Sequence, residues 1–292
     1  MKVFLNGEIL PASKAAIPVD DRAVLYGDSI FETVRAYSGK PFRLSKHIAR
    51  LEKACAFFRL KCPFNRSEIE RAVELTIRAN DLDQQGVDAY VRITLTGGKA
   101  SGTPDLRREE LPNFFIIARE YVPPPQRFYK KGISVIISQI RKNPHSPVPF
   151  MKTGNYLDSL IARQEAIERG ADDAIFLTTN GFISEATTSN ISMVRGNRLS
   201  TPAKRCALLP GITRDVVCEI ARGLEIEIDF VVSDLSHLFS ADEIFLTNSL
   251  VEIVPVTKVE GEIIGKGIPG QITRKLHEAY RDFVSRELKV HL

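Results

Sequence analysis

Four short segments of the sequence carry groups suited to binding a charged, planar small molecule. Lys152 follows a proline-rich loop, and its amine could attack a carbonyl carbon if burial or a neighbouring cation keeps it neutral. Glu185 follows a predicted turn and could face a protonated ring nitrogen, because an electron-accepting pyridine needs a negative partner to keep its proton. Residues 209–214 predict a loop that enters a helix, where free N–H groups can hold a phosphate, and Asn248 and Ser249 offer further donors. Taken singly, these features also fit a solvated lysine, a solvated strand end and an ordinary helix start.

Four further polar residues could bind anionic groups. Arg50 lies on the polar face of a predicted helix. Tyr90 and Arg92 alternate on one face of a predicted strand, where a hydroxyl and a guanidinium would form a wall that binds a carboxylate. Tyr26 could belong to the same wall or cap a strand. The alternatives are an exposed arginine and a solvated sheet face.

The first half of the chain predicts an antiparallel sheet with two helices. Residues 1–40 alternate short apolar runs with turn signals, which is typical of strands joined by tight hairpins. Helical spacing of apolar residues begins at Ser45, and a second helix is expected to begin at Ser67, with Glu70 completing a capping box. Residues 89–96 alternate strictly between apolar and polar side chains, which predicts one strand with a polar face.

The second half again mixes strands and helices, without an internal repeat. The sequence predicts a strand at 133–138 and a hairpin at 174–185 around the Asn180-Gly181 turn. Further strands are expected near 191–194 and 243–247, and helices after Thr213 and Gly270.

The three prolines at 123–125 forbid a helix and disfavour strand pairing. They predict a linker at 121–131, between an N-terminal α+β domain at 1–120 and a second domain at 132–292.

The composition is that of an ordinary globular protein, with 43% hydrophobic and 26% charged residues. Lys and Arg exceed Asp and Glu by only four, and they are spread along the chain, so nucleic acid and anionic membranes are poor partners.

The N-terminal run lacks a signal-peptide core, which predicts a soluble, cytoplasmic protein. Four cysteines at positions 55, 62, 206 and 218 form no C-x-x-C pair, so we expect reduced thiols, without a metal site or disulfide.

The order and spacing of several runs match one enzyme family. The runs are 26–32, 47–51, Lys152 with Asn155 and Tyr156, 184–185, 189–190, 211–214 and 241–243. Together they resemble the class IV, or fold-type IV, pyridoxal-phosphate aminotransferases, which include branched-chain and D-amino-acid aminotransferases and aminodeoxychorismate lyase. The resemblance covers nearly the whole chain. It implies a two-domain α+β fold, with a smaller N-terminal α+β sandwich and a larger C-terminal domain in which helices surround a barrel-like sheet.

The resemblance also implies pyridoxal 5′-phosphate (PLP) as cofactor, with a role for each matching residue. Lys152 would form the Schiff base with the cofactor and move a proton between the substrate α-carbon and cofactor C4′. Glu185 would hold the pyridine nitrogen and Tyr156 the phenolic oxygen. The other implied cofactor contacts are Arg50, Ile212, Thr213, Asn248 and Ser249 around the phosphate and Leu209 against the ring. The implied substrate contacts are Tyr26, Phe31, Tyr90, Arg92 and Leu250.

Details of the runs bear on the reaction. Residues 88–92 and 211–217 are most similar to branched-chain enzymes, which favours transfer from a branched-chain or hydrophobic L-amino acid to 2-oxoglutarate. Thr33 stands where those enzymes usually have glycine, and the run 247–252 is similar to some aminodeoxychorismate lyases, so release of pyruvate and 4-aminobenzoate is the alternative. The family's D-amino-acid aminotransferases bind the substrate carboxylate with an arginine and a histidine, and neither is apparent at 96–99. Specificity for D-amino acids therefore ranks below the branched-chain and lyase alternatives.

The alternative to an enzyme is a non-catalytic protein that binds phosphorylated metabolites. Such a protein would use Arg50 and the 211 loop but would not require Lys152. The family resemblance also implies a homodimer.

Overall fold

The computed structural model describes residues 1–100, 105–107 and 111–292, and its contacts divide the chain into two compact units. Unit 1 comprises Met1–Val122, Met151–Asn155 and Val284–Leu292. Unit 2 comprises Pro123–Phe150 and Tyr156–Phe283.

These units differ from the expected division at 1–120, 121–131 and 132–292. The segments 151–155 and 284–292 belong to unit 1 by their contacts, although they lie in the second half of the sequence. The expected linker contains a short helix of unit 2, α4 (Arg127–Lys131). Residues 121–126, which include the proline run, form neither helix nor strand, and the prolines have no N–H to donate.

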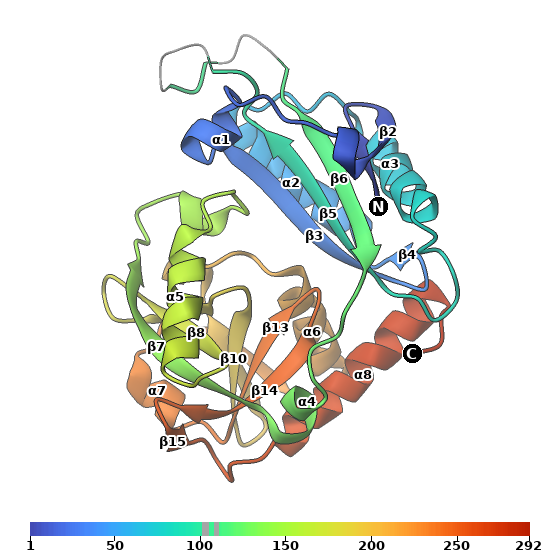
Figure 1. Cartoon of the computed structure of the whole chain (residues 1–292). Helices are drawn as coiled ribbons and strands as arrows, with labels where there is room; N and C mark the ends of the chain where they lie inside the picture. Colours follow the sequence, from blue (N-terminus) through green and yellow to red (C-terminus); the bar gives the residue numbers. More distant parts are fainter. Residues whose placement is uncertain (101–104, 108–110) are drawn as a thin grey trace. The chain divides into compact units, whose positions relative to one another are not determined.

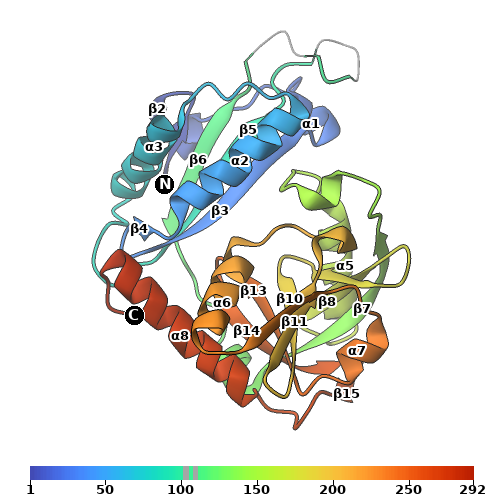
Figure 2. The ribbon, with the colours of Figure 1, turned by 180° about the vertical axis from the view of Figure 1, so that it is seen from behind.

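Unit 1 is built on a six-stranded antiparallel sheet in the order β2-β1-β6-β5-β3-β4. Figures 1 and 2 show that α2 and α3 cover one face of this sheet. The apolar residues of α2 recur at helical spacing and pack with Val34 and Val91 of the sheet in one buried core. The elements are β1 (Lys2–Leu5), β2 (Glu8–Pro11), η1 (Ala12–Lys14), α1 (Arg22–Tyr26), β3 (Ser29–Tyr37), β4 (Lys40–Pro41), α2 (Leu44–Phe58), α3 (Arg66–Ala79), β5 (Ala89–Thr96) and β6 (Phe114–Glu120).

The expected start of the second helix was wrong by one residue, and its cap was wrong by two. The helix α3 begins at Arg66, and its N-cap is Asn65, whose side chain accepts from the backbone N–H of Glu68 while Glu68 accepts from Asn65. This is the same capping-box spacing as the expected Ser67–Glu70 pair, met two residues earlier. Asparagine is as good an N-cap as serine, and the hydroxyl of Ser67 donates to it (2.8 Å).

Unit 2 contains a nine-stranded mixed sheet in the order β12-β11-β10-β13-β14-β7-β8-β9, with β15 paired to β14. The strand β9 also packs against β10 and β11, so the sheet curls on itself as a half-barrel. Helix α5 packs on β7 and β8, and α6 packs on β12 and β13. The elements are β7 (Ile133–Lys142), η2 (Val148–Phe150), α5 (Leu157–Glu168), β8 (Asp173–Thr178), β9 (Ile183–Ala186), β10 (Asn190–Arg195), β11 (Arg198–Pro202), η3 (Lys204–Cys206), α6 (Ile212–Gly223), β12 (Glu227–Val231), α7 (Leu235–Phe239), β13 (Glu243–Asn248), β14 (Glu252–Val259), β15 (Glu262–Ile263) and α8 (Gln271–Leu288).

The mixed α+β class expected from the sequence is confirmed, and so is the hairpin of β8 and β9. The strand β7 continues past the expected end at residue 138, because residues 141 and 142 pair with β8 after a register shift. This extension carries Lys142 to the end of a paired strand. Within the described residues, every helix is too short or too polar to cross a membrane.

Candidate active site

The backbone around Lys152 is held by unit 1. The N–H of Phe31 donates to the carbonyl oxygen of Lys152 (2.9 Å), and the N–H of Gly154 donates to that of Ser29 (2.8 Å). Thr153 forms an antiparallel bridge with Ile30 between them. Residues 152–154 therefore pair with the first half of β3, on the edge whose far end pairs with β4.

The side chains of Lys152 and Arg92 meet at one aromatic ring. Nζ of Lys152 lies 4.5 Å from the centre of the Phe31 ring, and Cζ of Arg92 lies 3.6 Å from it. Phe31 pairs with Thr94 across the β3–β5 ladder, so Arg92 is its diagonal neighbour on the same sheet face. The ring is 3% exposed, and cations over an aromatic face are attracted by its quadrupole. Phe31 thus brings together an amine and a guanidinium.

Tyr26 and Tyr90 lie in the same unit as this cluster. Tyr26 ends α1, and the following Gly27 carbonyl accepts from the side-chain amide of Asn155 (3.5 Å). A Cβ at Gly154 would overlap the hydroxyl of Ser29, so only glycine allows this close approach. Tyr90 is on the same face of β5 as Arg92, and the guanidinium of Arg119 lies 4.7 Å from its ring centre.

Arg50 is held in a buried ion cluster of unit 1. Its Nε donates to Oε1 of Glu32 (2.8 Å) and its Nη2 donates to Oε2 (2.7 Å), which is the bidentate arrangement of an arginine and a carboxylate. Nδ1 of His47 lies 2.7 Å from the same Oε2. Glu32 and His47 are each 1% exposed. Burial raises the pKa of Glu32, but the charge and hydrogen bond of Arg50 and the hydrogen bond of His47 outweigh it and lower the pKa to about 2.

Glu185 is a buried carboxylate in unit 2. It accepts from the backbone N–H of Leu209 (3.0 Å), from the side-chain amide of Asn190 (3.3 Å) and from Nζ of Lys142 (2.5 Å). The amide of Asn190 also donates to the carbonyl oxygen of Leu209 (2.9 Å). Glu185 is therefore oriented from three sides by donors on three separate segments. Sequence reasoning missed Lys142, because only the strand extension brings it beside β8 and β9.

The start of α6 lies beside the same asparagine. Its N-cap is Gly211, and no described side chain caps the helix. A Cβ at Gly211 would overlap Oδ1 of Asn190, so this approach requires glycine. Ile212 and Thr213 supply the first N–H groups of the helix, which point out of its N-terminus, where an anion is favoured.

The turn between β13 and β14 is closed by Asn248. Its Oδ1 accepts from the N–H groups of Leu250 (2.8 Å) and Val251 (2.9 Å), and its amide donates to Oγ of Ser189 (2.9 Å). Both ends of this side chain thus hold the turn, which presents Ser249 and Leu250. Asn248, which the sequence predicts as a phosphate contact, thus also fixes the turn that carries Ser249.

The two groups in unit 2 fit the two ends of PLP. A helix start without a side-chain cap suits the phosphate, and a buried carboxylate suits the protonated pyridine nitrogen. Asn190 touches both groups, so they are neighbours. Tyr156, at the N-cap of α5, is the first residue of its segment of unit 2, directly after the Lys152 segment of unit 1.

Comparisons with known proteins agree with this chemistry. A family model described as amino-transferase class IV matches residues 29–259. A protein of Methanocaldococcus jannaschii described as a putative branched-chain-amino-acid aminotransferase is 37% identical over 97% of this chain and 96% of its own. The branched-chain amino acid aminotransferase structure of Escherichia coli superposes with a TM-score of 0.92 at 30% identity, covering 98% of this chain and 95% of that chain. The branched-chain aminotransferase of Thermoproteus uzoniensis, solved with norvaline, gives a TM-score of 0.89 at 31% identity, covering 97% and 94%. The chain therefore belongs to the class IV aminotransferases, the family of PLP-dependent enzymes that its sequence resembles.

Proposed function

We propose that the protein transfers an amino group from a branched-chain or similar hydrophobic L-amino acid to 2-oxoglutarate in a ping-pong reaction. The observation that carries this proposal is the grouping of Lys152 and Arg92 on the Phe31 ring. An amine can remove the α-proton, a guanidinium can bind a carboxylate, and an aromatic ring can receive an apolar side chain. The similarity to branched-chain enzymes supports the same substrate class.

The cofactor supplies an aldehyde that condenses with amines and a ring that accepts electrons from the substrate α-carbon. Lys152 would supply the amine that holds the cofactor at its aldehyde carbon, with release of water, and would later accept the proton that leaves the substrate α-carbon. Glu185, whose position three donors fix, would accept a hydrogen bond from the protonated pyridine nitrogen. Tyr156 would donate a hydrogen bond from its hydroxyl to the phenolic oxygen of the cofactor.

The phosphate end of the cofactor has its own set of proposed contacts. The N–H groups of Ile212 and Thr213, the hydroxyl of Ser249 and the guanidinium of Arg50 would bind the phosphate. Asn248 would act by holding the turn that presents Ser249. The remaining proposed contacts are Leu209 with the ring, and Tyr26, Tyr90 and Leu250 with substrate.

Three assays test the proposal. Purified protein with PLP is given leucine with 2-oxoglutarate in the first assay and aminodeoxychorismate in the second. In the third it is given D-alanine with 2-oxoglutarate. We expect glutamate from leucine. Pyruvate from aminodeoxychorismate without glutamate from leucine would instead establish the lyase, and glutamate from D-alanine alone would establish D-specificity.

Borohydride reduction of the PLP-loaded protein, followed by peptide mapping, separates an enzyme from a simple binder. We expect the reduced label on the peptide that contains Lys152, and no label in Lys152→Ala. A protein that binds PLP but leaves Lys152 unmodified would be a non-catalytic binder.

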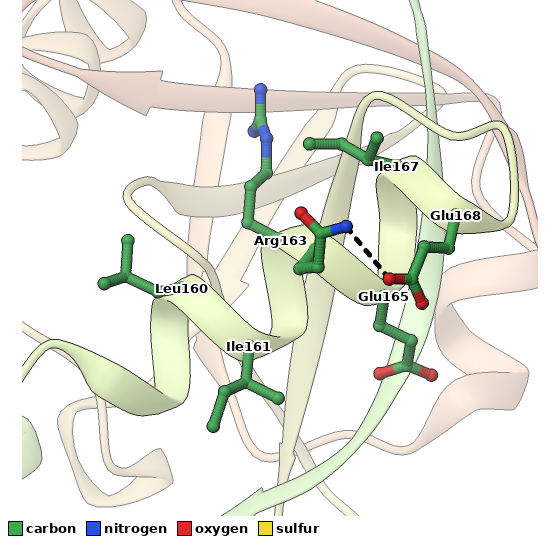
Figure 3. A pocket seen from close by; sticks show the side chains of 7 residues that line it. Leu160, Ile161, Arg163, Glu165, Ile167 and Glu168 are labelled. Carbon is green, nitrogen blue, oxygen red and sulfur yellow. Dashed lines mark hydrogen bonds between the residues drawn. The ribbon is translucent and has the colours of Figure 1, made fainter.

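We also propose that the protein is a homodimer. Leu157, Leu160 and Ile161 of α5 are 68%, 59% and 51% exposed, which is unusual for three apolar side chains within two helical turns. Figure 3 shows Leu160 and Ile161 projecting from α5 at a surface pocket that Arg163, Gln164, Glu165, Ile167 and Glu168 also line.

A cytoplasmic location is proposed as well, and the four unpaired cysteines among the described residues support it.

A further inference from the structure

The ion cluster of Glu32, His47 and Arg50 lies at an unusual place in unit 1. Side chains on β3 alternate between the two sheet faces, so Glu32 shares a face with Ile30, Val34 and Ala36. These three apolar residues belong to the buried core beneath α2. Glu32 is thus a carboxylate in a row of core positions, where an uncompensated charge would be strongly destabilising.

Two residues of α2 hold this carboxylate, Arg50 by its charge and His47 by a hydrogen bond. His47 and Arg50 are three positions apart, and therefore lie on the same helix face. An ionised carboxylate only accepts hydrogen bonds, so Nδ1 of His47 carries the proton and donates to Oε2. The Arg50 fork takes Oε1 and Oε2 together. Glu32 is consequently fixed by His47 and in turn fixes the plane of the guanidinium.

We propose that Glu32 and His47 are positioning residues that hold Arg50 ready to bind the cofactor phosphate. This inference rests on the proposed function, because it deepens the role given there to Arg50. A free arginine side chain samples many rotamers, and ordering it on binding weakens affinity. The Arg50 side chain is 15% exposed, so its guanidinium lies at the edge of the core, where two hydrogen bonds to a buried carboxylate remove that disorder beforehand.

The proposal is tested by comparing PLP with pyridoxal, which lacks the phosphate. Each is titrated into cofactor-free protein, and the ratio of the two dissociation constants isolates the phosphate contribution. We expect Arg50→Ala to reduce the preference for PLP by about 10- to 100-fold, the range of a charge-assisted contact. Glu32→Gln should reduce it by about 10-fold, since it removes the charge and one acceptor. The double variant should lose no more than Arg50→Ala alone.

Further variants separate positioning from general stability. Asp88→Asn is the matched control, because Asp88 accepts two hydrogen bonds from Arg35 (3.1 and 2.7 Å), also on β3. It should leave the PLP preference unchanged even if it lowers the melting temperature. At His47, asparagine retains an N–H close to Nδ1 and should preserve the preference, whereas phenylalanine should reduce it. This pair keeps the test open if Glu32→Gln does not fold.

The possible failures are distinguishable. If wild-type protein shows no preference for PLP over pyridoxal, the proposed function itself is wrong. If wild type and Arg50→Ala behave as expected but folded Glu32→Gln and His47→Phe retain the full preference, the cluster only joins β3 to α2 and the positioning role is overturned.

Discussion

Phe31 and Lys152 are joined through both backbone and side chain. The Phe31 N–H donates to the Lys152 carbonyl oxygen (2.9 Å), and Nζ of Lys152 lies 4.5 Å from the centre of the Phe31 ring. Strand pairing with β3 therefore sets the position of the Lys152 backbone. The Phe31 ring lies beside the Lys152 amine and also contacts Arg92. This relationship connects the proposed base with the proposed carboxylate-binding residue.

Replacement of Arg92 by methionine should affect the dicarboxylate substrate most. We expect KM for 2-oxoglutarate to rise about 10- to 100-fold, because a charge-assisted contact is lost. KM for leucine should change less, and steady-state kinetics with each substrate varied would measure both. Arg71→Met, at an exposed position on α3 of the same unit, is the matched control. Equal effects of the two substitutions on 2-oxoglutarate would contradict a specific role for Arg92.

Replacement of Glu185 by glutamine should weaken PLP binding by about 10- to 100-fold and lower kcat, since a neutral amide cannot keep the pyridine nitrogen protonated. Cofactor titration and the absorbance spectrum of the loaded protein would measure this. Glu165→Gln, in the same unit and near the hydroxyl of Ser138 (3.3 Å), should bind PLP as wild type does. A normal spectrum and affinity in Glu185→Gln would reject the assignment.

The two ends of α6 predict opposite results for the same substitution. Gly211→Ala introduces a Cβ that overlaps Asn190, so it should displace the helix start and reduce PLP affinity at least about 10-fold. Gly223→Ala meets no heavy atom within 4 Å, and should leave affinity unchanged. Isothermal titration with PLP compares them. Similar affinities for both variants would show that the helix start does not contribute to binding.

Acid should destabilise unit 1 through Glu32 and His47. The pKa of Glu32 falls from 4.5 to about 2 on folding, so its contribution of about 3 kcal/mol is complete well above pH 4.5 and is lost as the pH falls toward 2. Burial lowers the pKa of His47, so below about pH 6.5 the unfolded chain gains a proton that the folded chain resists. Both effects make the free energy of unfolding fall as the pH is lowered.

The free energy of unfolding can be measured with urea at pH 7, 5 and 4. It should fall less in Glu32→Gln than in wild type, and an equal fall would refute the assignment to Glu32.

Replacement of Ile161 by glutamate should dissociate the proposed homodimer. A charge placed among exposed apolar side chains of α5 cannot be buried against a second copy without a large cost. Size-exclusion chromatography with light scattering would give the mass. Leu75→Glu alters an equally exposed leucine on α3 and should leave the dimer intact. A wild-type monomer, or a dimeric Ile161→Glu, would exclude this interface.

Local patterns in the sequence were sufficient for much of the fold. The alternation at 89–96 predicted β5, and the Asn-Gly turn predicted the β8–β9 hairpin, because both signals lie within a few residues. The placement of Lys152 was different. Its pairing with Phe31 joins distant parts of the sequence, and no local periodicity records it.

The site shows the same division between local and long-range signals. Glu32, His47 and Asn190 lay within the runs that resembled the family, but their spatial partners gave them their roles. A signal for Glu32 was present, since it is the one charged residue among the alternate positions 30, 32, 34 and 36. Lys142 had no such signal, because its contact with Glu185 depends on a register shift between β7 and β8.

The pairing of residues 152–154 with β3 bears on attempts to produce the N-terminal part alone. A fragment ending at Val122 would contain every strand of the six-stranded sheet, yet it would lack the segment that satisfies the backbone of Ser29 and Phe31. An exposed row of amide and carbonyl groups is a template for pairing with other chains. Such a fragment would tend to self-associate through β3, and adding residues 151–155 as a separate peptide should suppress that association.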